Sequence, residues 1–595
     1  MEFIMRAACH YTVSALHPSH HFFQVRLTIL QPNPLGQKLW LPNWILGSYM
    51  IRDFSRHIIS VSAKTTEGLL LSVKKIAKNQ WSVSPYEGEI MISYEVYAWD
   101  LSVRGAHLDQ THGYFNGSCL LLAVEGQEDK ASTIEIHLPE QHQTWRIATT
   151  LDTLPSSQTG VYRYQAANYV TLLDHPVEMG EFAEVAFTTH NTPHRVVVTG
   201  KHRADLNRLS RDLTRICAAA IDFWGDDTPP FAHYLFQVMA VGNGYGGLEH
   251  RSSTSLLCSR EDLPLTTEPE HKLGEKYKAF LGLCSHEYFH SWLVKRIQPN
   301  VLVNPDLHQE NYTELLWVFE GFTSYYDDLL LARASVISTQ DYLDLLAQAI
   351  TRHLRTLGRF QQTVTDSSFD AWTKYYKQDE NTPNSVVSYY IKGSLVALCI
   401  DLKLRQLSDN TMSLDTVMRQ LWRDYGKTGL GIHNDTVQNI TQSLVSEDLS
   451  EFWQQCLYST QELPFTELLS AQGVVVNYKY DNAKNQPLAS LGIRGQMAEG
   501  GFQIQNVWRG GAAECAGISA GDVLMAIDGL KVSAQLEKTV ASYAIGDTLN
   551  VHLFRRDELM QCQVVLQSSV ADFCSLQLST ESNSRHRAER WILAQ

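Results

Sequence analysis

The sequence predicts a multidomain α+β protein, in which an all-β region, a largely helical region and a second region of short strands follow one another. Three successive patterns support this prediction. Residues 1 to about 180 alternate between hydrophobic and polar side chains, which is typical of half-buried strands. From about residue 203 the hydrophobic residues recur at helical spacing. From about residue 475 short strands separated by glycines return.

The length of 595 residues exceeds what one core can fill, because single hydrophobic cores stop growing at about 250–300 residues. Hydrophobic residues make up 44% of the chain and charged residues 19%, so apolar material suffices for several cores. We expect an N-terminal all-β domain over residues 1–180, a central part over 181–335, a helical part over 336–474, a small β domain over 475–575 and a tail over 576–595.

Charge and cysteine usage limit the partners and the compartment. The chain carries 49 basic and 64 acidic residues, and its net charge of −15 argues against nucleic acid or an anionic membrane surface as the main partner. No apolar run approaches the roughly eighteen residues of a membrane span, and the first residues lack the layout of a signal peptide. Ten cysteines occur without a C-x-x-C pair, which favours free thiols. The sequence therefore predicts a cytoplasmic protein.

The N-terminal region is expected to be a β region without a helix of convincing length. Residues 22–29 and 90–96 alternate in the manner of strands with one buried face, and prolines, glycines and asparagines separate such runs. No stretch up to residue 180 has the spacing of a long helix.

A change of period near residue 204 marks the start of the helical region. Residues 204–224 place their hydrophobic side chains on one stripe, as an amphipathic helix does: Leu206, Leu209, Leu213, Ile216 and Ala220. An extended segment over 233–257 follows. Further helices are expected near residues 271–296, 311–335, 340–358, 385–407, 413–425 and 434–458.

The C-terminal region begins with a linker at residues 482–487, which are rich in asparagine and end in proline. Short strands then continue to about residue 575. The last twenty residues are expected to form a short closing helix.

Residues 286–290 form the pattern His-Glu-x-x-His within the helix expected at 271–296. Residues four apart lie on one face of an α-helix, so His286 and His290 can direct their imidazoles at one metal ion. Glu287 then lies beside the coordination position that the protein leaves open, where it can act as a general base on water. This short pattern also occurs by chance in long chains. Whether it forms a zinc site therefore depends on the presence of the other residues that such a site needs.

A catalytic zinc ion requires a third protein ligand. A third histidine after a glycine is excluded, because Leu293 and Arg296 occupy those two positions. The alternative is a carboxylate from a second helix. Glu320 stands in an apolar stretch, where an ionised side chain is costly unless it is paired or bound to a metal. Glu314 and Asp328 are rivals that lie nearer a solvent-exposed face.

The sequence therefore predicts one zinc ion held by His286, His290 and Glu320. Asp327, two turns after Glu320, is a candidate hydrogen-bond acceptor for a ligand imidazole. An equally good interpretation of Asp327 is a solvated charge near the end of its helix.

These motifs resemble those of known enzymes. Residues 286–292, followed by Trp-Val-Phe-Glu-Gly-Phe at 317–322, resemble the gluzincin metallopeptidases of the aminopeptidase N type. The long gap between His290 and Glu320 is similar instead to the related glycyl aminopeptidase family, whose members carry a C-terminal PDZ domain. Other stretches that match this family lie at 41–54, 174–180 and 246–250, with Leu46 where the family usually has proline.

The resemblance implies a fold and an activity. A thermolysin-like zinc catalytic domain would occupy residues 181–335, and the helical domain over 336–474 would complete the active site. The activity would be that of a zinc-dependent aminopeptidase, which hydrolyses the first peptide bond of peptides with a free N-terminus and prefers N-terminal Gly or Ala.

The resemblance also implies roles for further residues. Glu249 would accept hydrogen bonds from the α-ammonium group of the substrate, and Gly246 and Gly247 would let the substrate backbone approach. A plain strand-end glutamate is the alternative for Glu249. Tyr390 would hydrogen-bond the developing oxyanion, with core packing as its alternative. Adjacent Tyr389 points about 100° away on a helix, so only one of the two serves.

The C-terminal region contains two motifs that need separate interpretation. Residues 517–521 fit the nucleophile elbow G-x-S-x-G, but a strand rather than a helix follows them. Residues 510–529 are instead similar to bacterial PDZ domains. That similarity makes Leu491, Gly492 and Ile493 the expected carboxylate-binding loop, whose backbone N–H groups could hold a peptide C-terminus. A role as structural spacer or lid is the alternative.

Two other functions remain as alternatives. The chain could be a PDZ adaptor with a degenerate peptidase scaffold, but the six intact residues His286, Glu287, His290, Glu320, Glu249 and Tyr390 count against degeneracy. It could also be a zinc endopeptidase, but Glu249 would crowd an extended chain on the N-terminal side of the cleaved bond.

Overall fold

The computed structural model describes residues 7–269 and 273–594. The first six residues, the start of the helix predicted at 271–296 and Gln595 lie outside the described residues. The chain divides into two compact units. The first unit comprises Met1–Asn311, Ala334–Ile337 and Leu421–Ile432, and the second comprises Tyr312–Arg333, Ser338–Gln420 and His433–Gln595.

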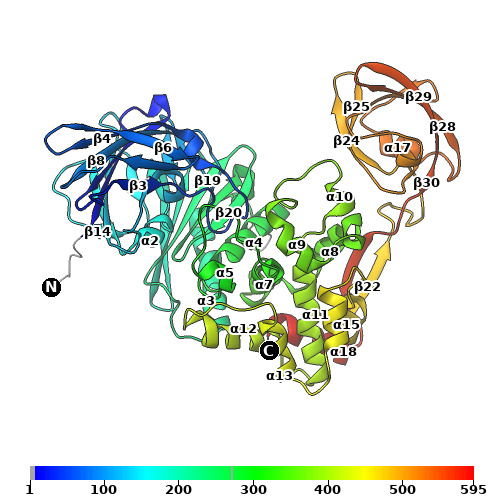
Figure 1. The fold of residues 1–595 in the computed structure, drawn as a ribbon. Coiled ribbons are helices and arrows are strands. Elements are labelled where there is room, and N and C mark those ends of the chain that lie inside the picture. Colours follow the sequence, from blue (N-terminus) through cyan, green and yellow to red (C-terminus); the bar gives the residue numbers. More distant parts are fainter. Residues whose placement is uncertain (1–6, 270–272, 595) are drawn as a thin grey trace. The chain divides into compact units, whose positions relative to one another are not determined.

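A large mixed sheet opens the first unit (Figure 1). Buried and partly exposed side chains alternate along β2 (Phe22–Ile29) and β8 (Ile90–Tyr97), which pair antiparallel. This alternation confirms the predicted strands, since one face of each strand packs into the core. The sheet has the order β14 (Asp152–Leu154), β15 (Val161–Ala166), β12 (Ser132–His137), β1 (Cys9–Ser14), β2, β8, β4 (Ile58–Thr65) and β5 (Leu70–Leu71).

Two smaller sheets complete the N-terminal β region. One has the order β13 (Arg146–Ala148), β16 (Val177–Gly180), β10 (His112–Phe115) and β9 (Ala106–Leu108), and the other β11 (Ala123–Val124), β3 (Gln37–Trp40), β7 (Gln80–Val83) and β6 (Val73–Ala77). The α-helices described here are short, α1 (Gly117–Leu120) and α2 (Tyr169–Leu173), as the sequence predicts.

A five-stranded sheet follows in the first unit, in the order β17 (Phe182–Thr189), β18 (Thr192–Thr199), β19 (Tyr234–Val241), β21 (Ser253–Ser259) and β20 (Tyr245–Glu249). β20 is therefore an edge strand. The predicted amphipathic helix is confirmed as α3 (Leu206–Trp224), which begins where the Asp205 side chain accepts a hydrogen bond from Arg208 N. The next helix, α4 (Glu275–Phe289), packs against α3, β20 and β21.

The helix predicted to run to residue 296 ends earlier, at Phe289. The chain then turns tightly, because Val294 adopts a φ of 85°, a conformation that a β-branched residue rarely takes. Lys295 N donates to His290 O across this turn at 3.1 Å. The prediction of a continuous helix was wrong here, because residues 290–297 form this turn through hydrogen bonds between neighbouring backbone groups, such as Val294 N to Ile297 O at 2.8 Å.

The second unit is mainly helical. Up to residue 471, its α-helices are α6 (Leu316–Phe319), α7 (Gly321–Arg333), α8 (Thr339–Leu354), α9 (Val364–Phe369), α10 (Thr382–Ser385), α11 (Ile391–Leu407), α13 (Thr436–Ser443), α14 (Ser450–Leu457) and α15 (Phe465–Ala471). The first unit holds α5 (Asn300–Val303), and α12 (Leu414–Leu421) ends at its boundary.

Two predicted helices are each divided in the structure. The helix expected at 434–458 is interrupted before α14, where the Asp448 carboxylate accepts hydrogen bonds from N and Oγ of Ser450, the first residue of α14. The helix expected at 311–335 consists of α6 and α7, which meet at Glu320.

A small β module lies within the second unit (Figure 1). Its main sheet has the order β24 (Ile493–Ala498), β25 (Gly501–Val507), β26 (Val523–Ile527), β28 (Thr548–Arg555) and β29 (Glu558–Val565), with β27 (Leu530–Lys531) paired to β26. Two short helices accompany it, α16 (Ala512–Cys515) and α17 (Leu536–Val540), as does the pair β23 (Ala489–Ser490) and β30 (Gln567–Ser568).

Strands on either side of this module pair with each other, β22 (Val474–Lys479) with β31 (Phe573–Leu578). The chain ends in α18 (Ser582–Leu593), which confirms the predicted closing helix. Trp591 Nε1 donates to Tyr325 Oη on α7 at 3.0 Å, so this helix packs into the core of the second unit. In residues 7–269 and 273–594, no helix has the length and apolar character needed to cross a membrane.

Candidate active site

The last turn of α4 contains His286 and Glu287, and His290 is the residue that caps this end of the helix. The two imidazole rings lie on the same face of the helix, with their centroids 4.6 Å apart and their planes at 87°. His290 and Glu287 are buried, and His286 is partly exposed. The spacing of four residues thus brings two nitrogen ligands together, as the sequence predicts.

Aromatic packing holds α4 in place. Phe289 is fully buried between Phe223 and Trp224 of α3, with ring centroids 5.4 and 5.0 Å away. Tyr288 is also fully buried, and its hydroxyl meets His194 Nε2 on β18 at 3.0 Å. The two residues that the motif leaves unspecified therefore anchor the helix, while the motif residues face the site.

The proton position on His290 suits a metal ligand. His290 Nδ1 lies 3.1 Å from the carbonyl oxygen of Leu293, in the tight turn that ends α4. A carbonyl oxygen can only accept, so Nδ1 carries the proton and Nε2 keeps its lone pair. Two imidazoles one helical turn apart, one of them oriented in this way, are a donor set that fits a divalent zinc ion.

Glu249, at the end of β20, joins this group. Ligand atoms of Glu249, Glu287 and His290 all lie within 4.8 Å of one another. Glu249 is 4% exposed, and its Oε1 has no hydrogen-bond partner among the residues that the structure describes. A buried carboxylate oxygen is costly without a donor, so this position suits a cationic ligand group.

Two glycines make room for these carboxylates. A Cβ atom at Gly247 would collide with the Glu287 carboxylate, and one at Gly47 would lie 2.5 Å from both oxygens of Glu249. Gly47 also has a φ of 91°, which glycine adopts without strain. The family resemblance includes the stretch around Gly47, but only the structure shows that this glycine borders Glu249.

A buried ion pair stabilises the turn after Glu249. Lys295 Nζ donates to Asp174 Oδ1 at 3.1 Å, and His250 Nδ1 approaches the same oxygen at 3.4 Å. Arg251 N donates to Asp174 Oδ2 at 2.9 Å. Burial opposes ionisation of Asp174, but Lys295 and His250 outweigh it and hold the pKa of Asp174 well below its ordinary value.

The second unit contains Glu320 and Tyr390. Glu320 is 2% exposed, at the junction of α6 and α7, and Tyr390 immediately precedes α11. Helices α7 and α11 cross closely, since a Cβ atom at Gly321 of α7 would lie 2.6 Å from the Cα atom of Gly393 in α11. This crossing brings Tyr390 near Glu320: burial and then the Glu320 carboxylate raise the pKa of Tyr390 well above its ordinary value, so the phenol stays protonated.

Other tyrosines surround Tyr390. Tyr376 Oη lies 3.3 Å from Tyr390 Oη, and the fully buried ring of Tyr389 stacks on that of Tyr390 with centroids 4.8 Å apart. No sequence pattern pointed to Tyr376, because its contact with Tyr390 arises from the folding of the loop before α10. Asp327 is half-buried on α7, and its Oδ1 accepts a hydrogen bond from Asp328 N at 2.6 Å.

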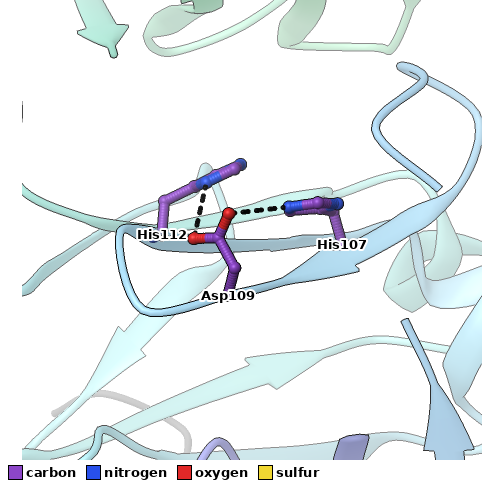
Figure 2. Close-up of side chains that lie close together, drawn as sticks. All are labelled: His107, Asp109 and His112. Atoms are coloured by element: carbon purple, nitrogen blue, oxygen red, sulfur yellow. Dashed lines mark hydrogen bonds and ion pairs between the residues drawn. The ribbon is translucent and has the colours of Figure 1, made fainter. Parts of the chain in front are cut away.

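A second cluster of titratable residues lies in the β9–β10 hairpin, where Asp109 stands between His107 and His112 (Figure 2). His107 Nε2 lies 3.2 Å from Asp109 Oδ2, and His112 Nδ1 lies 3.8 Å from Asp109 Oδ1. Asp109 Oδ1 also accepts hydrogen bonds from Thr111 N, Thr111 Oγ1 and His112 N at 2.6 to 3.1 Å. Because the donors to Asp109 come from the turn itself, these hydrogen bonds stabilise the hairpin.

Glu178 on β16 is buried beside this hairpin. Its carboxyl group is expected to make the free energy of unfolding depend on pH. Burial raises the pKa of Glu178 to about 7, although His112 and Thr199 favour the ionised form. The folded protein therefore keeps a proton that the unfolded chain loses above its ordinary pKa of 4.5. We expect about 3 kcal/mol of stability to be lost as the pH rises from about 4.5 to 7, at about 1.4 kcal/mol per pH unit.

Thermal unfolding of wild type and Glu178→Gln at pH 5 and pH 8 tests this expectation. The melting temperature of Glu178→Gln should change less between the two pH values than that of wild type. The exposed Glu67→Gln variant is the matched control. An unchanged pH dependence in Glu178→Gln would contradict the assignment.

The expected carboxylate loop of the small β module adopts a tight conformation. Gly492 has a φ of 70°, and its carbonyl oxygen accepts a hydrogen bond from Trp508 N at 2.9 Å. Leu491 is buried, and its carbonyl oxygen accepts from Ala513 N at 2.8 Å. The two carbonyl groups are thus bonded within the module.

Comparisons with known proteins agree with this architecture. Residues 10–181 match the Peptidase M61 N-terminal domain, residues 279–396 match M61 glycyl aminopeptidase, and residues 489–566 match a PDZ domain. An aminopeptidase N family protein from Idiomarina loihiensis, solved by crystallography, is 40% identical. That match covers 98% of this chain and 100% of the other, with a TM-score of 0.94. The chain belongs to the M61 glycyl aminopeptidase family.

More distant structures also match. The M1 zinc metallopeptidase from Deinococcus radiodurans is 13% identical over 77% of this chain and 94% of its own, with a TM-score of 0.47. Native yeast LTA4 hydrolase is 12% identical over 78% of this chain and 70% of its own, with a TM-score of 0.46. The search of curated proteins finds no match.

Membership of the M61 family confirms the predicted fold class and enzyme class. The protein is a metallopeptidase with an N-terminal β domain, a catalytic domain with helices and a C-terminal PDZ domain. The small β module is therefore this PDZ domain.

Proposed function

We propose that this M61 family member is a zinc-dependent aminopeptidase that removes the first residue from short peptides and favours Gly or Ala there. The observation that supports this proposal most strongly is the buried Glu249 carboxylate beside Glu287 and His290. A carboxylate oxygen in need of a donor, within reach of a general base, suits the α-ammonium group of a peptide. The preference for small residues follows the name of the family.

One zinc ion is proposed as the cofactor, with His286, His290 and Glu320 as its protein ligands. Four-residue spacing on α4 supports the two histidines, and the burial of Glu320 supports the third ligand, since an ionised buried carboxylate needs a cationic partner. Asp327 remains the proposed acceptor for a ligand imidazole. When bound, zinc supplies a Lewis acid that polarises a carbonyl group and makes water more acidic.

The side chains of the protein would carry out proton transfer, stabilisation of the developing negative charge and binding of the substrate backbone. Glu287 accepts a proton from the attacking water at its carboxylate and delivers it to the nitrogen of the leaving amine. Tyr390, kept protonated by its surroundings, donates a hydrogen bond to the oxygen that becomes negative. Gly246 and Gly247 on edge strand β20 let the substrate backbone approach.

Glu249 would make the enzyme specific for free N-termini. In Glu249→Gln, a neutral amide replaces the acceptor of a charge-assisted hydrogen bond, so kcat/KM for alanyl-p-nitroanilide should fall about 10- to 100-fold. The exposed Glu87→Gln variant is the matched control. Equal losses on free and N-blocked peptides would contradict a role in binding the amine.

A panel of aminoacyl-p-nitroanilides and N-blocked peptides, with and without a chelator, tests the whole proposal. Glycyl and alanyl substrates should be hydrolysed fastest, blocked peptides should resist, and the chelator should stop turnover. Efficient cleavage inside blocked peptides would favour the endopeptidase alternative. Absence of any hydrolysis would favour the adaptor alternative, in which only the PDZ domain acts.

The PDZ domain is proposed to bind a peptide C-terminus through Leu491, Gly492 and Ile493. Backbone N–H groups in such a loop can hold a carboxylate. We also propose a cytoplasmic location, because the ten cysteines are free in the structure and most are buried.

A further inference from the structure

We propose that Arg104 binds the C-terminal carboxylate of short peptides, so that the active site selects di- and tripeptides with both ends free. This inference deepens the proposed aminopeptidase function and rests on it, because Glu249 is the anchor for the other end of the peptide. No sequence motif singled out Arg104, which comes from the loop before β9 in the N-terminal β domain.

Arg104 contacts the strand that would receive the substrate. Its Nη2 donates to the carbonyl oxygen of Gly247 at 3.1 Å. A Cβ atom at Gly246 would meet Arg104 Nη1 at 3.9 Å and no other described atom within 4 Å. β20 is the last strand of its sheet, so the guanidinium group stands at an edge where there is room for a peptide.

The charge of Arg104 is not neutralised locally. Across residues 7–269 and 273–594, no carboxylate forms an ion pair with it, and its buried Nε has no hydrogen-bond partner. A half-buried guanidinium group usually meets an anion, because leaving a charge uncompensated away from water is costly. Its planar set of donors matches a carboxylate better than any other common peptide group.

The spacing along β20 determines the length of the peptide. Glu249 lies two and three residues after Gly247 and Gly246, which is about 7 to 10 Å along a strand. An extended peptide covers about 3.3 to 3.6 Å per residue, so two or three residues reach from one charge to the other. A peptide that runs antiparallel to β20 would place its amine at Glu249 and its carboxylate near Arg104.

The backbone around Arg104 is held rigidly. The Val103 carbonyl oxygen accepts hydrogen bonds from Tyr114 Oη at 3.0 Å and Asn116 Nδ2 at 2.8 Å, and the Arg104 carbonyl oxygen accepts from Cys119 Sγ at 3.3 Å. Tyr114 Oη also donates to Ser255 Oγ on β21 at 2.8 Å. Since β21 pairs with β20, the arginine loop and the substrate strand are fastened together, and little ordering is needed when a ligand binds.

The test compares peptides that differ only in their C-terminal charge. For wild type, kcat/KM for Ala-Ala-Ala should exceed that for Ala-Ala-Ala-amide by about 10- to 100-fold, the contribution of a charge-assisted hydrogen bond. The same acid-to-amide ratio should approach about 1 for hexaalanine, whose carboxylate lies about 20 Å from its amine when extended. A wild-type ratio near 1 for the tripeptide overturns the inference.

Two variants assign the effect to Arg104. Arg104→Gln should abolish the tripeptide ratio, while Arg104→Lys, which keeps the charge but not the fork of donors, should give an intermediate value. The exposed Arg26→Gln variant is the control and should keep the wild-type ratio. A general loss of activity cancels in the acid-to-amide ratio of kcat/KM. A purely structural role of Arg104 would lower kcat/KM for the acid and for the amide alike and leave their ratio unchanged, which would contradict the inference.

A binding measurement separates this inference from the proposed function. Calorimetric titration of Ala-Ala-Ala and its amide into Glu287→Gln, with and without Arg104→Gln, does not depend on turnover. Tighter binding of the acid that Arg104→Gln removes supports the inference even if the enzyme proves to have another reaction. Equal binding of acid and amide overturns it even if aminopeptidase activity is confirmed.

Discussion

Replacement of Glu287 by Gln is expected to lower kcat about 10²- to 10⁴-fold while zinc remains bound. Gln has almost the same size as Glu, so it fits beside Gly247 as the carboxylate does. Its amide oxygen cannot accept a proton at neutral pH, which removes the transfer from water to the leaving amine. Steady-state kinetics on alanyl-p-nitroanilide, together with the zinc content by elemental analysis, measure both effects.

A control on the same helix separates chemistry from folding. Glu275, at the start of α4, has a side chain that is 71% exposed, so Glu275→Gln makes the same chemical change far from the motif. This variant should keep wild-type kcat. If Glu287→Gln also loses zinc, the group acts as a ligand or a structural support, and the proposed role as general base is wrong.

Replacement of His290 by Ala is expected to remove zinc and activity together. Loss of one of three protein ligands should weaken zinc binding at least about 100-fold, more than the loss of a supporting hydrogen bond. Competition with a chromophoric chelator measures the affinity. Because a ligand that binds only the folded state stabilises it, wild type should also melt at a lower temperature once zinc is removed.

Reconstitution makes this prediction specific. Chelator-treated wild type should regain activity when zinc is returned, and His290→Ala should not. The exposed His586→Ala variant should behave as wild type in both steps. Full zinc content in His290→Ala would show that the ion is held elsewhere, and the proposed ligand set would then be wrong.

Local patterns explain why much of the fold follows from the sequence. The alternation at β2 and β8 and the stripe along α3 reflect burial on one face, which any packing partner would impose. Helix ends were less predictable. The turn at Val294 and the new start after Asp448 depend on hydrogen bonds to groups that the hydrophobic pattern does not reveal.

The residues of the candidate site also differ in how far the sequence predicts their placement. His286 and His290 are four residues apart, about one helical turn, so the placement of both on one face follows from the helix itself. Glu249 lies far from them along the chain, and only the packing of α4 on β20 brings it to Glu287 and His290. The family resemblance suggested this meeting, but no property of the residues alone could show it.

The sequence by itself determined that this chain has a metallopeptidase motif on a helix, an N-terminal β region and a C-terminal β module. These features are local, because they depend on spacing within one element. Only the tertiary structure revealed that Gly47 gives Glu249 its space and that Arg104 reaches Gly247. Such contacts join residues about 140 to 200 positions apart, and they depend on how sheets and loops pack, which no spacing within one segment encodes.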